Sequence, residues 1–286
     1  MFAIYKKDLK SAFTGMTGWV LCAFVVFMSG LYFTALCLTG GYADYGYVLN
    51  NMTFIFIAIV PLLTMRCVEE RRQKTDQLLL TSPVTICQIV WGKYLALLTV
   101  YAVPILVMCT CPLVASKYGT VSFARAYSCI LAFFLVGAAA LAIGLFISTL
   151  TESQIISAVL TFGSLLILYF MPSLATMLPS TAGASLIAFT MLAIVVGIIV
   201  YVMTKSVVTA AGVVSAGEIA LLIIYFVNSD LLESAFPNML TALGLFSRFT
   251  NFVNGIFDVT GLVFMASTAL LFVLFTCQSY EKRRWN

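Results

Sequence analysis

The sequence of 286 residues contains no histidine and very little charge. The absence of histidine excludes Ser-His-Asp catalysis, imidazole metal sites and the usual pH switch. Only 9% of the residues are charged, whereas a soluble domain carries about 25%. Because so few charges cannot cover a globule of this length, most of its surface must face something other than water.

Two chemical motifs are also missing. The eight cysteines include no CxxC pair, and no histidine or acidic co-ligand flanks them, which argues against a zinc or redox site. No G-x-x-x-x-G-K-[ST] loop occurs, so the chain does not cradle ATP in that manner. We therefore expect buried cysteines that act as small apolar residues, with no catalytic residues and no bound metal.

Long apolar runs dominate what remains, since 62% of the residues are hydrophobic. About 20 mostly apolar residues cross a bilayer as a helix, because only a helix satisfies its own backbone there. This criterion predicts an all-α polytopic membrane protein with about eight spans. They are residues 17–38, 51–67, 94–114, 126–149, 155–175, 184–204, 208–228 and 260–277. Pro172 and Pro179 are expected to interrupt the fifth span.

The distribution of basic residues predicts the orientation. With the N-terminus inside, twelve Lys and Arg residues fall in inner segments and three in outer segments. Basic residues favour the cytoplasmic side, so both termini are expected there. The outer three are Lys117, Arg125 and Arg248. An even number of spans, six or eight, satisfies this distribution.

Two segments have a helical pattern without being spans. Residues 1–16 alternate apolar and basic side chains at steps of three or four, which predicts an amphipathic helix at the inner membrane surface. Residues 229–259, called here the outer segment, repeat apolar side chains at helical spacing, with expected breaks at Pro237, Gly244 and Gly255. We interpret the outer segment as short re-entrant helices, with an interfacial helix as the alternative.

The inner segment 66–93, called here the coupling segment, concentrates charge around a leucine triplet. It holds five basic and three acidic residues together with Leu78, Leu79 and Leu80. A solvated loop has no need of three leucines, so we expect a short helix that docks on a partner. Ser82 and Pro83 end this helix in the prediction, and Thr85 caps the next one.

These residues resemble the cytoplasmic segment of ABC-2 type transporter permeases, in the branch of the gliding-motility and nitrous-oxide-reductase-maturation permeases. The motifs are Glu69, Glu70, Arg71, Arg72, Thr75, Leu78–Leu80, Ser82, Pro83, Ile89–Val90 and Gly92–Tyr94, then residues 150–154, 246–249 and 279–285. The resemblance covers roughly residues 1–170 and 240–286. The usual member has six spans, so residues 172–228 are interpreted as two inserted spans in a single permease domain of residues 1–286.

The resemblance implies a non-catalytic subunit of an ATP-driven exporter. Residues 1–16 correspond to an elbow helix, and residues 69–83 to a coupling helix that contacts a separate ABC ATPase carrying ATP and Mg. A second permease chain, identical or homologous, is implied, as is a bacterial cytoplasmic membrane. The outer gate or docking residues are expected to be Phe246, Arg248, Phe249, Phe252 and Asp258.

Other functions remain open at this point. A gradient-driven carrier needs ionisable groups near the bilayer midplane, and only Glu218 comes close. A membrane enzyme lacks its usual histidines and clustered carboxylates. A mechanical relay to a membrane-anchored extracytoplasmic protein, without substrate passage, fits the sequence as well as export does. No nucleic-acid partner is expected.

Overall fold

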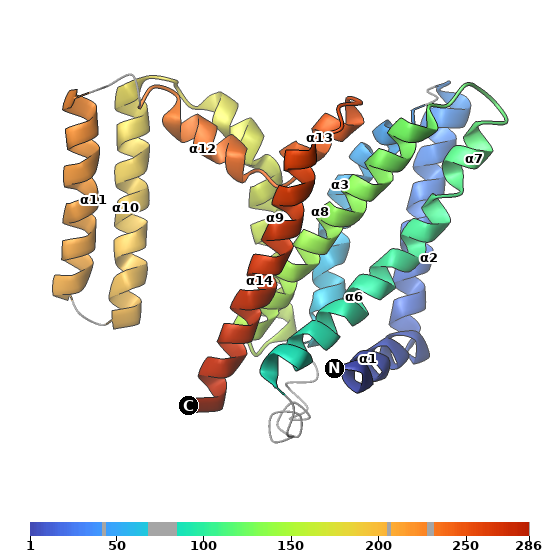
Figure 1. Cartoon of the computed structure of the whole chain (residues 1–286), viewed down its shortest axis with the longest axis horizontal. Coiled ribbons are helices and arrows are strands. Elements are labelled where there is room, and N and C mark those ends of the chain that lie inside the picture. Colours follow the sequence, from blue (N-terminus) through green and yellow to red (C-terminus); the bar gives the residue numbers. More distant parts are fainter. Residues whose placement is uncertain (42–43, 68–84, 205–206, 228–231, 286) are drawn as a thin grey trace. The chain divides into compact units, whose positions relative to one another are not determined.

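The computed structural model describes residues 1–41, 44–67, 85–204, 207–227 and 232–285, and the regular elements in these ranges are helices (Figure 1). They form two compact units. The first unit comprises Met1–Ile167 and Arg248–Asn286, and the second comprises Leu168–Ser247. The predicted coupling helix, residues 69–83, lies outside the described residues, as do all ten of its predicted contact residues.

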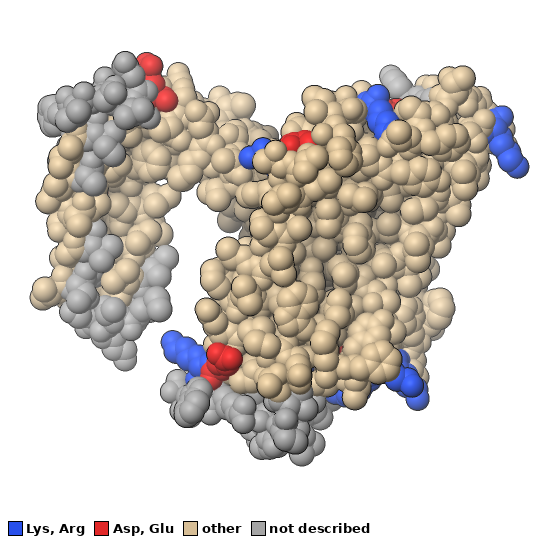
Figure 2. All heavy atoms as spheres, viewed as in Figure 1, with Lys and Arg blue, Asp and Glu red and all other residues tan. Residues whose placement is uncertain are grey.

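The first unit contains most of the helices. They are α1 (Phe2–Thr14), α2 (Met16–Tyr32), the π-helix η1 (Phe33–Thr39), α3 (Tyr45–Thr64), α6 (Ile86–Met108), α7 (Cys111–Ala115), α8 (Phe123–Leu150), most of α9 (Gln154–Met177), α13 (Ser247–Val253) and α14 (Val259–Trp285). On the face drawn in Figure 2, charged atoms lie at the helix ends, and the surface between them is uncharged. This distribution suits helices that cross a hydrocarbon layer.

Six helices in the described ranges are long and apolar enough to cross a membrane. They are Gly18–Thr39, Tyr45–Thr64, Ile86–Ala115, Phe123–Leu150, Gln154–Met177 and Val259–Lys282. Each overlaps a predicted span. The second and third begin six and eight residues earlier than predicted, because a helix continues beyond the apolar stretch from which a span is recognised.

The core of the first unit is built around α8. This helix packs against α3, α6 and α14, and Gly137 leaves room for the side chain of Tyr101, which a Cβ at this position would meet. Phe56 of α3 lies 4.8 Å from Tyr101 of α6 and 5.4 Å from Phe133 of α8, measured between ring centroids. Tyr101 also donates a hydrogen bond to the carbonyl of Phe133 at 2.9 Å, so its buried hydroxyl is satisfied.

The N-terminal helix α1 confirms the helix predicted for residues 1–16. It packs on α2 and α6, with Ile4 buried and the Tyr5 hydroxyl 3.1 Å from the hydroxyl of Thr99. Phe2, the first residue of α1, is 75% exposed. The apolar side chains of α1 are therefore divided between contact with α6 and the surface.

The prediction that Pro172 interrupts the fifth span is wrong. Helix α9 continues through Pro172 to Met177. A proline removes one backbone donor, and membrane helices tolerate this where local adjustments satisfy the freed carbonyl.

The second unit contains the C-terminal part of α9, together with α10 (Ala182–Thr204), α11 (Val207–Val227) and α12 (Ala235–Leu243). Helices α10 and α11 pack against each other where two further spans were predicted. Phe189 of α10 meets Phe236 of α12 edge-to-face, with centroids 5.3 Å apart. Pro237 does not break α12 as expected, because it lies in the first turn, where its missing N–H leaves no helical bond unmade.

Gly137 provides a test of this packing. A Cβ at Gly137 would lie 2.2 Å from the Tyr101 hydroxyl, inside a packed aromatic cluster. We expect Gly137→Ala to lower the free energy of unfolding by about 1–3 kcal/mol, as overpacked cores do. Thermal unfolding in detergent measures this. The matched control is Gly163→Ala on α9, where a Cβ meets no heavy atom within 4 Å; equal melting temperatures for the two variants would contradict the packing.

Candidate functional site

The outer segment folds as two short helices, α12 and α13, separated at Gly244, one of the predicted break positions. Helix α13 buries one apolar side. Phe249, Phe252 and Val253 are buried, each at most 4% exposed. Their burial fixes α13 onto the first unit, and Phe249 extends the aromatic core, 5.8 Å from Phe133.

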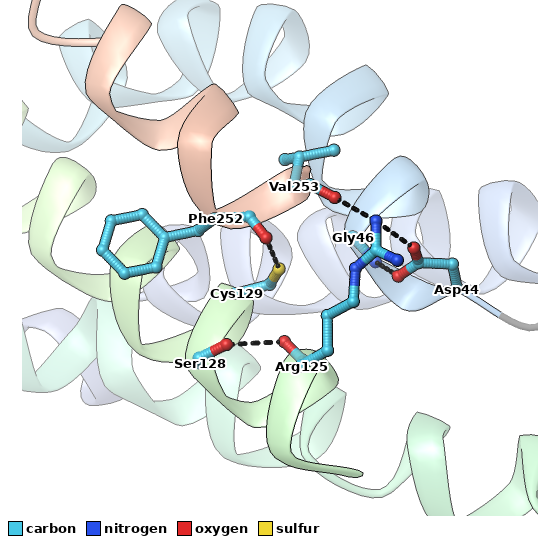
Figure 3. A network of polar contacts seen from close by, with 7 residues as sticks. All are labelled: Asp44, Gly46, Arg125, Ser128, Cys129, Phe252 and Val253. Atoms are coloured by element: carbon cyan, nitrogen blue, oxygen red, sulfur yellow. Dashed lines mark hydrogen bonds and ion pairs between the residues drawn. The ribbon is translucent and has the colours of Figure 1, made fainter. Parts of the chain in front are cut away.

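An arginine holds the end of α13 to two spans (Figure 3). Arg125, in the first turn of α8, pairs with the Asp44 carboxylate at 2.6 Å through its Nη2 atom. The same Nη2 donates a hydrogen bond to the carbonyl of Val253. Asp44 in turn accepts the N–H of Gly46 at 3.1 Å and caps the start of α3. One guanidinium therefore links α3, α8 and α13, and we call Asp44, Arg125 and Val253 the arginine clamp.

A second contact reinforces the clamp one turn further along α8. The Cys129 thiol donates to the carbonyl of Phe252 at 3.1 Å. Gly46 makes room for both contacts, since a Cβ there would lie 3.2 Å from the Cys129 sulfur and 3.4 Å from the Cα of Val253. The last two residues of α13 thus have their carbonyls satisfied by side chains of α8.

Gly255 turns the chain away from α13 in a left-handed conformation, with φ of 83°. Its N–H bonds the carbonyl of Phe252, and the N–H of Ile256 bonds that of Asn251, both at 2.9 Å. This is the helix-ending arrangement that favours glycine. A Cβ at Gly255 would also lie 3.2 Å from Nε of Arg125, so both the backbone and the clamp require glycine here.

Asp258 begins the last span. Its carboxylate accepts hydrogen bonds from the backbone N–H of Gly261 and from the side-chain amide of Asn251, the latter at 3.1 Å. These bonds hold the pKa of Asp258 below its ordinary value of 3.8. The carboxylate therefore connects α13 to the start of α14. Its negative charge also interacts favourably with the positive N-terminal end of the α14 helix dipole.

The structure divides the five predicted outer residues between the two units. Arg248 lies over the ring of Phe264 on α14, 5.6 Å from its centroid, and belongs with Phe249, Phe252 and Asp258 around α13. Phe246 belongs to the second unit, where its ring lies 5.6 Å from that of Tyr169.

The sequence did not identify Asp44 or Cys129 as functional, and it used Arg125 only as an outer charge. The one available signal was that Asp44 and Arg125 carry opposite charges next to spans on the same predicted side. Within the described ranges, no group of three or more Cys, Asp or Glu side chains is placed to hold a metal ion. The arrangement is suited to holding a backbone in place rather than to chemistry.

Comparison with known proteins decides the family. The family model described as ABC-2 family transporter protein matches residues 38–279, which is most of the chain. The chain belongs to this family. No curated protein matches the chain. As an ABC-2 transporter permease, it is a multi-pass membrane component, and the arginine clamp and the coupling segment both fall within the matched range.

The arginine clamp predicts a non-additive pair of substitutions. We expect Arg125→Gln and Asp44→Asn each to lower the free energy of unfolding of the permease by about 1.5 kcal/mol. This value is the lower end of the range for a charge-assisted hydrogen bond, because the pair is partly open to water. The double variant should lose less free energy of unfolding than the sum of the two single losses, because both substitutions remove the same ion pair. Chemical unfolding in detergent gives the three values.

Lys117→Gln is the matched control, since Lys117 is another cation of the predicted outer side and is exposed. Its effect should stay within about 0.5 kcal/mol, as for ordinary surface changes. Strict additivity of the two clamp substitutions would show that the pair contributes nothing to stability.

Asp258 predicts an acid dependence at the start of α14. Because its pKa is lowered by folding, its contribution is complete above the ordinary value of 3.8 and is lost as the pH falls through the lower folded-state value. Amide hydrogen-exchange protection at residues 259–262 should therefore be constant from pH 7 to pH 5 and fall below pH 4. Asp258→Asn removes the titration, and protection that still falls in that variant would assign the effect to another group.

Proposed function

We propose that this chain is the permease subunit that couples ATP hydrolysis on a separate ABC ATPase to the export of a substrate. The observation that carries the proposal is the family match over residues 38–279. ATP and Mg belong on the ATPase, because the permease has no phosphate loop of its own. The membrane is proposed to be the bacterial cytoplasmic membrane, with both termini on the cytoplasmic side, as the twelve inner basic residues favour.

The helices beside the coupling segment support a path for movement. Helix α3 ends at Thr64, and α6 begins at Ile86 with Thr85 as its N-cap residue, although the Thr85 side chain makes no capping bond. Both helices pack on α8. Displacement of the coupling segment by an ATPase therefore acts on two helices that share one central neighbour, and α8 carries Arg125 at its far end.

Helix α1 is proposed to serve as the elbow helix. It is separated from α2 by Gly15 and packs on α6. A Cβ at Gly92 of α6 would lie 3.3 Å from Ile4 side-chain atoms, so the two helices approach closely. This contact would let α1 follow α6 when the coupling segment moves.

Helices α10 and α11, with 23 and 21 residues, are proposed as the two additional spans, giving eight in all. Their lengths match a bilayer core, and both fall in the region 172–228 that departs from the usual six-span pattern. We further propose two permease chains in the working assembly, identical or homologous, because the ABC ATPases act as dimers.

A mechanical relay is a second candidate function, favoured by the surface beyond α13. Ile256 and Phe257 follow the clamp and are 60% and 59% exposed. Such apolar side chains at a fixed position suit contact with a membrane-anchored extracytoplasmic protein. Photo-crosslinking from position 257 in cells separates the two functions, since a crosslinked extracytoplasmic protein supports relay and lipid adducts alone support export.

The coupling segment predicts different effects for leucine and charge substitutions. Burial of a leucine contributes about 1.5–3 kcal/mol, and an aspartate in its place also needs desolvation. We therefore expect Leu79→Asp to release the ATPase from the permease. Pairs made by Glu69, Glu70, Arg71 or Arg72 at an aqueous interface contribute about 0–1 kcal/mol each, so Arg71→Glu should weaken binding only modestly and in a salt-dependent manner.

Co-purification of the ATPase with each permease variant, at low and high salt, measures both effects. The matched control is Leu150→Asp, an exposed leucine at the end of α8 and outside the coupling segment. Full retention of the ATPase by correctly inserted Leu79→Asp permease would mean that the leucine triplet does not dock on the ATPase.

A further inference from the structure

Arg248, in the first turn of α13, carries a charge that no described carboxylate neutralises. Its guanidinium carbon lies 5.6 Å from the centroid of the Phe264 ring on α14. Its Nε atom is buried and makes no hydrogen bond, and among the described residues no ion pair involves Arg248. A guanidinium has five N–H donors, and a partly desolvated cation without a counter-charge is costly.

The other cations of the predicted outer side are in different surroundings. Arg125 pairs with Asp44 at 2.6 Å and donates to the carbonyl of Val253. Lys117 is exposed, so water can hydrate it. Arg248 is only partly exposed and lies over an aromatic ring. It therefore combines a defined position with a charge and donors that remain available to a ligand.

The place of Arg248 along α14 is close to the edge of the hydrocarbon layer. The last span runs from Val259 to Lys282, and Phe264 lies about 8 Å along it from the start, at 1.5 Å per residue. The span is about 36 Å long on the same measure, whereas the hydrocarbon core is about 30 Å thick. Phe264 therefore lies just inside the hydrocarbon, and α13 brings Arg248 to it from beside the start of α14 (Figure 1).

An exposed apolar line continues from Phe264 along α14. Leu271 and Phe275 follow at intervals of seven and four residues, which places all three on the same side of the helix. Leu271 is 46% exposed and Phe275 is 42% exposed. The line is about 16 Å long, close to half of the core thickness of about 30 Å. It therefore has the length of an acyl chain in one leaflet.

We propose that Arg248, with the apolar line of Phe264, Leu271 and Phe275, is a binding site for an anionic phospholipid. The phosphate accepts hydrogen bonds from the guanidinium, whose planar fork matches phosphate oxygens, and one acyl chain covers the apolar line. A zwitterionic lipid binds less well, because its ammonium group balances its own phosphate and is repelled by Arg248. Charge complementarity and the length of the line thus select the same ligand.

The bound lipid contacts two elements at once. Arg248 belongs to α13, and the apolar line belongs to α14. An occupied site therefore joins these helices, in addition to the hydrogen bond from Asn251 to Asp258 at 3.1 Å. Because a ligand of the native state stabilises it, anionic lipid should raise the melting temperature of the permease, and Arg248→Gln should remove this increase.

The test uses the full-length permease in phosphatidylcholine nanodiscs that contain a small fraction of phosphatidylglycerol with a photoactivatable acyl chain. After irradiation and digestion, mass spectrometry should find lipid adducts on residues 264–275. A phosphatidylcholine probe with the same acyl chain should give about tenfold fewer, the effect of one charge-assisted hydrogen bond. Yields are divided by those on α2, whose exposed apolar side chains contact lipid in any inserted variant.

Three variants assign the preference to the charge of Arg248. Arg248→Gln should lower the phosphatidylglycerol adducts to the phosphatidylcholine level, whereas Arg248→Lys, which keeps the charge, should retain most of the difference. Lys117→Gln is the matched control and should behave as the unmodified permease does. Excess glycerol phosphate should not displace the probe, because it has no acyl chain for the apolar line.

Any of three results would overturn the proposal. They are equal labelling by the two lipid probes, an unchanged lipid preference in Arg248→Gln, and displacement of the probe by glycerol phosphate, which would mean that a soluble phosphate binds instead. Absence of adducts from residues 264–275 would likewise show that something other than lipid covers the line. The measurement needs neither an ATPase nor a transported substrate, so its outcome is independent of the proposed function.

Discussion

The fold depends on one constraint, which is that hydrocarbon offers no partner to a backbone N–H or C=O group. Every crossing segment must therefore be a helix that satisfies itself. Where α13 ends at Val253, its last carbonyls need partners from elsewhere, and Arg125 and Cys129 provide them. The clamp thus satisfies backbone carbonyls at a helix end, just as each span satisfies its own backbone groups within the helix.

The clamp also solves an electrostatic problem. A partly buried guanidinium loses some of its hydration and is costly unless it is paired, and Asp44 neutralises Arg125 at 2.6 Å. Since Asp44 simultaneously caps α3, the charge pair is fixed to two helix starts rather than to flexible side chains alone. This is why a single pair can define where α13 lies on the first unit of the permease.

Helices were predictable from the sequence where apolar length alone decides them, as for α8 and α14. The effects of proline were not, because Pro172 and Pro237 are tolerated through local geometry that composition does not express. Around α13, the repeat of apolar side chains in the outer segment predicted a helix, and the structure has one at Ser247–Val253. Asp44 and Cys129 were missed, because their roles depend on contacts with residues more than 80 positions away.

The clamp imposes an order on biosynthesis. Arg125 emerges 81 positions after Asp44, so the ion pair can form as soon as α8 is inserted, but Val253 follows 128 positions later. At about 5–20 residues per second, translation leaves the guanidinium waiting roughly 6–26 s for that carbonyl. Throughout this interval α3 and α8 of the nascent permease are joined by the ion pair, but the position that α13 later occupies at their ends is empty. Helix α13 binds there only shortly before the last span is synthesised.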